Sequence, residues 1–136
     1  MLKLTILSPE RRLLEGQAVD EVTLFGSEGQ IQILEGHAPM VGTLEVGEFS
    51  FRGTDGKSTA GFITDGFFEV RNNELVVTAE TLELKAEIDI DRAKKAQLEA
   101  ERVLKEANLD PDSFNRYQLK LQRALIRQQI ASKDHH

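Results

Sequence analysis

The stretch from Thr81 to Ala93, TLELKAEIDIDRA, separates two kinds of sequence pattern. Before it, short segments alternate between apolar and polar residues and are interrupted by turn residues. After it no glycine occurs, and apolar residues recur every three or four positions. Alternation is typical of half-buried strands, and the longer period is typical of amphipathic helices. The sequence therefore predicts a β domain over residues 1–86 and a helical segment over residues 87–136.

The β domain is punctuated by glycine, since all ten glycines precede Arg71 and supply turn and bulge conformations. Thr54-Asp55-Gly56 and Arg71-Asn72-Asn73-Glu74 are hairpin-turn signals. The alternation predicts strands over residues 2–7, 18–25, 31–34, 44–52, 57–64, 67–71 and 75–80. Many short strands of this kind indicate an antiparallel β-sandwich or flattened barrel, so the whole chain is of the α+β class.

The helical segment predicts two helices. Asp89 is placed to cap the first, and Asp110 is placed to cap a second whose first turn holds Pro111. The expected apolar stripes are Ile90, Ala93, Ala96, Ala100, Val103, Leu104 and Ala107 on the first helix, and Phe114, Tyr117, Leu121, Ala124, Leu125, Gln128 and Ala131 on the second. A loop of about four residues predicts an antiparallel hairpin. Because such a hairpin buries little apolar area alone, we expect it to dock on another surface, and conditionally.

Charge and composition exclude several function classes. Residues 1–86 hold seven basic and 14 acidic residues, a net of −7, against ten basic and nine acidic afterwards, a net of +1. An acidic first part argues against a nucleic-acid surface there. The absence of Cys suits a reducing cytosol, and no apolar run has the length of a membrane span, so any membrane association is expected through partners.

Signals of an enzyme are nearly absent. The chain lacks the phosphate-binding, dinucleotide-binding, nucleophile-elbow and zinc-protease motifs, and His37 alone cannot build a metal site. We expect no catalytic residues and no metal, and the hydrolase alternative is disfavoured. A free-standing sandwich that binds a small ligand is disfavoured too, because there is no Trp and the only Tyr, Tyr117, lies on a helix.

One charged feature stands out on the second helix. Arg116, Lys120, Arg123 and Arg127 are spaced by four, three and four residues, which aligns them on one helix face, the cation face. Guanidinium groups suit phosphate oxygens, and Arg92 could join the face if the hairpin closes. The alternative is a solvated face whose charges pair with Glu99, Glu101 and Glu106 of the first helix.

Several segments, taken in order, resemble the epsilon-subunit family of bacterial F-type ATP synthases. Residues 26–29, GSEG, and 33–39, ILEGHAP, look like the family's GSEG and GHAP loops. Residues 66–70, GFFEV, look like its G-x-x-E-V strand. Residues 88–93, IDIDRA, are similar to the I-D-x-x-R-A motif of members that bind ATP. The resemblance covers essentially the whole chain.

This resemblance implies a sandwich of about ten strands followed by the two-helix hairpin. It further implies a non-catalytic rotor subunit of a proton- or sodium-driven synthase, peripheral at the cytoplasmic face of the bacterial inner membrane. The implied partners are the gamma subunit, the ring of c subunits, and the alpha and beta subunits when the hairpin extends and inhibits ATP hydrolysis. The implied contact residues are Ser27, Glu28, Gly29 and Gln30 for the ring, and His37, Ala38, Pro39 and Met40 for gamma.

The same resemblance implies no required cofactor, with ATP as a regulatory ligand in members that sense it. The positions that match the family's nucleotide site are Ile88, Asp89, Arg92, Ala93, Arg123 and Arg127. Two departures are visible. Gln30 stands where some members carry Glu, and Glu99 stands where ATP-binding members carry an arginine.

Overall fold

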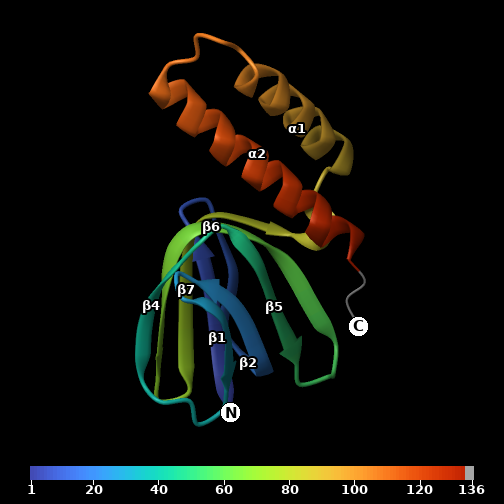
Figure 1. Cartoon of the computed structure of the whole chain (residues 1–136). Helices are drawn as coiled ribbons and strands as arrows, with labels where there is room; N and C mark the ends of the chain where they lie inside the picture. Colours follow the sequence, from blue (N-terminus) through green and yellow to red (C-terminus); the bar gives the residue numbers. More distant parts are fainter. Residues whose placement is uncertain (134–136) are drawn as a thin grey trace. The chain divides into compact units, whose positions relative to one another are not determined.

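The computed structural model describes residues 1–133, and the last three residues of the predicted helical segment, 134–136, lie outside the described part. Within it the chain forms two units, residues 1–85 and residues 86–133. The first unit contains seven strands and the second contains two α-helices (Figure 1). The predicted α+β class, a β-sandwich followed by a two-helix hairpin, is confirmed.

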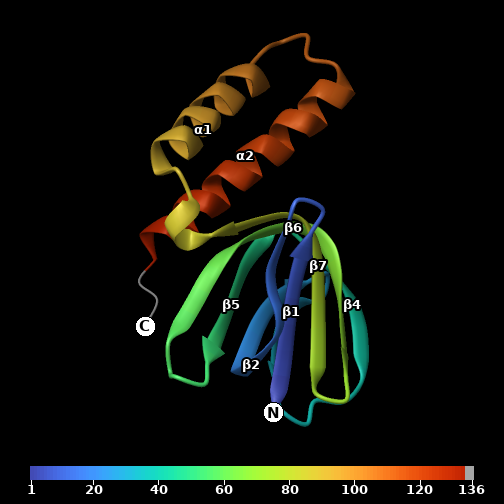
Figure 2. The ribbon, with the colours of Figure 1, turned by 180° about the vertical axis from the view of Figure 1, so that it is seen from behind.

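The strands of the first unit join into a closed circuit of hydrogen bonds. Their bounds are β1 Leu2–Ser8, β2 Arg11–Gly26, β3 Gly29–Leu34, β4 Met40–Leu44, β5 Gly47–Gly53, β6 Ser58–Arg71 and β7 Glu74–Leu84. Figure 2 shows β1 between β2 and β7, with both of which it pairs. β2 also pairs with β5, β5 with β6 and β6 with β7, which closes the circuit. Each pairing is antiparallel except that of β1 with β7.

The described residues form seven strands rather than about ten because two strands are long and change partners along their length. β2 has 16 residues and β6 has 14. β6 pairs with β5 over residues 58–63 and with β4 over residues 66–70. Between these stretches Asp65 has a φ of 35°, a turn-like conformation inside one continuous strand. The two strands predicted over residues 57–64 and 67–71 are therefore one.

The strand predicted over residues 44–52 is wrong at its start, since Leu44 ends β4 and β5 begins at Gly47. β4 was not predicted at all, because Gly42 has the appearance of a turn residue. In the structure, a Cβ on Gly42 would stand 2.6 Å from the ring of Phe68. This glycine therefore permits close approach of the β4 backbone to a core aromatic ring.

The core of the first unit follows from alternation along the strands. In β1, for example, Leu2, Leu4 and Ile6 are buried while Lys3 is exposed. The buried cluster comprises Leu2, Leu4, Ile6, Val19, Val22, Leu24, Ile33, Leu44, Phe49, Phe51, Ile63, Phe68, Val70, Leu75, Val77, Ala79 and Leu82. A short 3-10 helix, Lys85–Glu87, follows β7.

The second unit is an antiparallel hairpin of α1, Ile90–Leu104, and α2, Pro111–Ser132. Both predicted caps are confirmed: the Asp89 side chain accepts a hydrogen bond from the Arg92 N–H at 3.1 Å, and Asp110 accepts one from the Ser113 N–H at 3.1 Å. The connection is longer than the four residues expected, because α1 ends at Leu104. It comprises residues 105–110 and so includes Ala107 of the predicted stripe.

The predicted apolar stripes are only partly right. Ala93, Ala100, Val103 and Ala124 are buried, but Ile90, Phe114 and Leu125 are exposed. Ile130 is buried although it lay outside the predicted stripe. On α2 it follows Leu119 and Ile126 at helical spacing, so α2 carries a second apolar stripe, on a different face from Ala124.

Candidate functional site

The turn proposed to contact the ring joins β2 to β3. Ser27, Glu28, Gly29 and Gln30 are all exposed, and Gly29 has a φ of 114°, which favours glycine. The Ser27 N–H donates to the carbonyl oxygen of Thr43 at 3.2 Å, and the Thr43 hydroxyl donates to the Ser27 hydroxyl at 3.1 Å. The turn is thus attached to β4.

The loop proposed to contact gamma lies between β3 and β4. His37 is half-buried, whereas Ala38, Pro39 and Met40 are exposed. The His37 N–H donates to the carbonyl oxygen of Leu34 at 3.1 Å, and His37 Nδ1 lies 2.7 Å from the carbonyl oxygen of Ala38. These two contacts hold the loop in a compact turn.

Two anchors hold the start of this loop. The Gly36 N–H donates to Asn73 Oδ1 at 2.7 Å, which joins the loop to the turn between β6 and β7. The α-amino group of Met1 lies 2.5 Å from Glu35 Oε1, and this hydrogen bond is the main reason why the pKa of Glu35 is lowered. The two predicted contact segments are therefore linked through β4, which begins at Met40 and bonds Ser27 through Thr43.

An apolar surface next to this loop was missed from the sequence. Val41, Phe67 and Val76 are 70%, 60% and 41% exposed. Val41 and Val76 flank Glu69 in one row across β4, β6 and β7, and Phe67 lies in the next row on the same side. We call these three side chains the apolar outer face. Local pattern could not have found it, because Val41 lies outside every predicted strand and Val76 stands in an apolar run with Leu75 and Val77.

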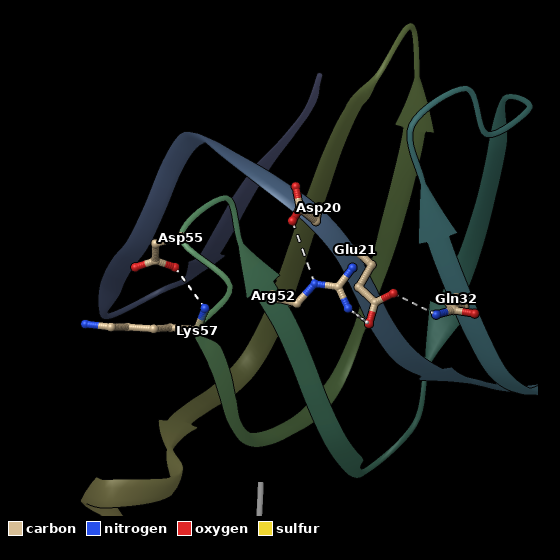
Figure 3. Close-up of polar contacts among 6 residues, drawn as sticks. All are labelled: Asp20, Glu21, Gln32, Arg52, Asp55 and Lys57. Atoms are coloured by element: carbon tan, nitrogen blue, oxygen red, sulfur yellow. Dashed lines mark hydrogen bonds and ion pairs between the residues drawn. The ribbon is translucent and has the colours of Figure 1, made fainter. Parts of the chain in front are cut away.

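The outer side of β2, β3 and β5 is different in character, because it carries charge. Arg52 on β5 lies 3.2 Å from Glu21 and 3.7 Å from Asp20, both on β2, and Gln32 on β3 donates to Glu21 at 3.1 Å (Figure 3). These polar groups satisfy one another at a solvated surface. The apolar outer face is thus the side of the sandwich whose chemistry favours a protein partner.

The residues proposed for the nucleotide on α1 have structural roles. Asp89 is exposed, and its carboxylate caps the helix. Ile88 and Ala93 are buried, and Arg92 is exposed. The Ala93 N–H donates to the carbonyl oxygen of Asp89 at 3.0 Å, the first turn of α1.

The hairpin brings the proposed arginines only partly together. Gln128 Nε2 donates to Gln97 Oε1 at 2.7 Å, which puts residues 97 and 128 at one level of the two antiparallel helices. At 1.5 Å per residue, Arg92 then lies about 9 Å from Arg127 and about 15 Å from Arg123 along the helix axis. Arg123 and Arg127, one turn apart on α2, are half-buried and have interaction partners.

The remainder of the cation face surrounds an aromatic ring. The Arg116 guanidinium lies 5.2 Å and the Lys120 ammonium 4.8 Å from the centroid of the Tyr117 ring. These are cation–π distances, so the two cations and the aromatic ring form one patch on α2. Among residues 1–133 there is no group of three or more acidic or His side chains that could hold a metal ion, and neither helix is long and apolar enough to cross a membrane.

Family models match both units. Residues 1–85 match the ATP synthase delta/epsilon chain β-sandwich domain, and residues 86–132 match the ATP synthase delta/epsilon chain long α-helix domain. The chain belongs to the ATP synthase delta/epsilon chain family. The predicted resemblance is confirmed, and so is the expectation that the protein is a non-catalytic subunit of an ATP synthase.

Bacterial relatives within this family align over nearly the whole chain. The ATP synthase epsilon chain of Geotalea daltonii is 41% identical over 97% of this chain and 94% of the relative. That of Trichlorobacter lovleyi is 39% identical over the same shares.

The fold recurs in chains of two solved structures. It is similar to a chain of the Euglena gracilis mitochondrial ATP synthase OSCP/F1/c-ring structure, with a TM-score of 0.83 at 23% identity over 91% of this chain and 77% of that one. It is also similar to a chain of the Tetrahymena thermophila mitochondrial ATP synthase central stalk/c-ring structure, with a TM-score of 0.70 at 15% identity over 96% of each.

Proposed function

We propose that this delta/epsilon-family chain is a rotor subunit of the central stalk, bound to gamma and to the ring of c subunits. The observation that carries this proposal is the apolar outer face. Val41 and Val76 are exposed on either side of Glu69, and Phe67 is exposed in the next row of the same side. Val41 directly follows the residues that the family resemblance assigns to gamma. An apolar patch on one side of a charged domain is typical of a protein-binding surface.

The contact with the ring is assigned to the turn of Ser27, Glu28, Gly29 and Gln30. Gln30 carries no charge, so its contribution is hydrogen bonding, and Glu28 supplies the only negative side chain of the turn. Because the Thr43 hydroxyl is hydrogen-bonded to Ser27, a force that the ring exerts on the turn would be transmitted to β4. Both similar mitochondrial structures are of assemblies that include a c-ring, which supports this partner. The coupling ion is a proton or sodium.

The hairpin is the proposed inhibitor of ATP hydrolysis. It is a separate unit with capped helices, and three of the five residues buried on those helices are alanine. Elements of limited packing area are those whose docking a ligand or partner can shift. In the extended state the cation face, Arg116, Lys120, Arg123 and Arg127, would meet the alpha and beta subunits.

ATP is the proposed regulatory ligand of the hairpin, without being a required cofactor. Arg123 and Arg127 would contact the phosphates, since they lie one turn apart on one face of α2. The other four proposed contacts lie toward the opposite end of the line along which the two helices meet: Ile88, Asp89, Arg92 and Ala93. The nucleotide would therefore lie along the helix axis. A direct ATP titration of the isolated chain tests this, and unchanged spectra at millimolar ATP would refute it.

The complex places the chain at the cytoplasmic face of the bacterial inner membrane, as a peripheral subunit. The stalk assignment is tested by co-purification of the full chain with isolated gamma, and failure to form a stable complex would overturn it. The inhibitory role is tested by deleting residues 87–136. We expect assembly to persist and ATP hydrolysis to rise, whereas unchanged hydrolysis would limit the hairpin to a structural role.

A further inference from the structure

Alanine supplies most of the buried side chains of the two helices, whose line of contact is the seam of the hairpin. Three of the five residues buried on α1 and α2 are alanine, and the other two are Val103 and Ile130. Ala100 and Ala124 are 0% and 1% exposed, and Ala93 is also buried. Ala96 and Ala131 are half-buried. Methyl groups allow helices to approach closely, but they interlock less than branched side chains do. Such a seam alone does not strongly distinguish one alignment of the helices from another.

A hydrogen bond between two glutamine side chains crosses this seam. Gln128 Nε2 donates to Gln97 Oε1 at 2.7 Å and also lies 3.3 Å from the carbonyl oxygen of Ala124 on its own helix. Both glutamines are half-buried. The second contact orients the Gln128 amide, so its N–H points across the seam rather than into solvent.

A comparison of the observed alignment of the helices with one shifted by one turn shows how this hydrogen bond favours the observed one. If α1 moves by one turn, Ala100 comes opposite Leu121 and Leu104 comes opposite Tyr117, so apolar residues still meet apolar residues. Gln97 then comes opposite Ala124, and Gln128 opposite Ala93. Gln97 loses its partner, and Gln128 keeps only the carbonyl oxygen of Ala124 on its own helix. Each amide then faces a methyl group across the seam, which is unfavourable for a partly buried polar group. The connection over residues 105–110 is long enough to tolerate such a shift of about 6 Å.

We propose that the Gln97–Gln128 pair specifies the register of the hairpin. It selects one alignment from a set that the alanine seam leaves close in energy, in the manner of a single polar residue in a coiled-coil interface. The register sets where Arg92 stands relative to Arg127, since a one-turn slide would reduce their separation along the helix axis by about 6 Å, from about 9 Å to about 3 Å. The geometry of any binding surface that contains residues of both helices therefore depends on this pair.

The absence of cysteine makes the register directly measurable. In the full chain, Ala100→Cys with Ala124→Cys reports the observed register, because these positions are one turn along each helix from the glutamines. Ala96→Cys with Ala124→Cys reports a slide by one turn. Each pair is oxidised under mild conditions, and the yields of intramolecular disulfide are compared in three backgrounds: the native sequence, Gln97→Ala with Gln128→Ala, and Gln122→Ala. The last removes an exposed glutamine from α2 and is the matched control.

We expect the ratio of shifted to observed disulfide to rise at least about fivefold when both seam glutamines are alanine, the change that corresponds to about one hydrogen bond. The control should leave the ratio unchanged, and Gln97→Glu with Gln128→Lys should restore it. If circular dichroism shows that the alanine variant has lost helix content, it is replaced by Gln97→Leu with Gln128→Leu, which keeps the volume of the side chains in the seam. An unchanged ratio in a helical variant overturns the proposal. No other synthase subunit is present, so the result is independent of the proposed stalk and inhibitory roles.

Discussion

Gly66 on β6 lies so close to Thr78 on β7 that a Cβ at residue 66 would overlap the Thr78 carbonyl oxygen. Gly66 opposite Ala79 also begins the stretch of β6 that pairs with β4, directly after the turn-like Asp65. The glycine of the G-x-x-E-V segment therefore has a steric explanation. It lets β6 bend against β7 while Phe68 points into the core and Phe67 points outward.

We accordingly expect Gly66→Ala to destabilise the sandwich by about 2–4 kcal/mol, because the blocking atom is backbone and cannot rotate away. Urea unfolding followed by circular dichroism measures this. Glu69→Gln, an exposed change on the same strand, should move the free energy of unfolding by less than about 0.5 kcal/mol. Equal midpoints for the two variants would show that β6 and β7 can separate locally at no cost.

The apolar outer face gives a prediction about binding. Phe67→Ser should weaken binding of the chain to isolated gamma by about tenfold or more, since a large exposed aromatic side chain in an apolar patch is a typical anchor. Its thermal unfolding should hardly change, because Phe67 is 60% exposed. Titration by calorimetry or surface plasmon resonance measures the affinity.

A matched control lies on β3. Leu34→Ser also removes an exposed apolar side chain, but from a residue that pairs with Glu21 beside the charged network of Arg52. It should leave the affinity for gamma within about twofold, a change smaller than one typical interface contact. Equal losses for Phe67→Ser and Leu34→Ser would mean that gamma does not distinguish the two sides of the sandwich.

Sequence patterns predicted what depends on neighbours along the chain. Asp89 and Asp110 were recognisable as caps because a cap, its helix and its hydrogen bond lie within a few residues of one another. The role of Gly42 could not be predicted in this way, since its reason is the ring of Phe68, 26 positions away on another strand. Short-range periodicity carries no information about that contact.

The same distinction between local and tertiary information applies to the candidate site. The turn at Ser27 and the loop at His37 were identified from local motifs, whereas their link through Thr43 depends on tertiary pairing. The axial distance between Arg92 and Arg127 depends on the register of the hairpin, which the helical pattern of either segment leaves open. The apolar outer face required knowledge of which side of each strand faces solvent.

The proposed nucleotide contact predicts that the response to ATP requires the two guanidinium groups of α2. Arg123→Ala with Arg127→Ala should abolish ATP-dependent chemical-shift changes in the isolated chain, because it removes both guanidinium groups from one turn of α2. Arg102→Ala is the control, since Arg102 lies on α1 and is 3.7 Å from Glu106 of its own helix. Shift changes that survive the double variant would place the nucleotide elsewhere.

The pH dependence of the hairpin follows from the cap of α2. Hydrogen bonds from the Ser113 side chain and N–H lower the pKa of Asp110 below its ordinary value of 3.8. As the pH falls, Asp110 therefore takes up its proton at a higher pH in the unfolded chain than in the folded chain. The contribution of Asp110 to stability is complete above pH 3.8 and is lost as the pH falls through the lowered pKa. Asp110→Asn keeps the capping acceptor but cannot titrate. We expect unfolding of α2, followed by circular dichroism across the acid range, to depend less on pH in this variant than in the native chain. Asp112→Asn, in the same turn but outside the cap, should retain more of the native dependence, and the reverse order would assign the acid sensitivity to the helix dipole instead.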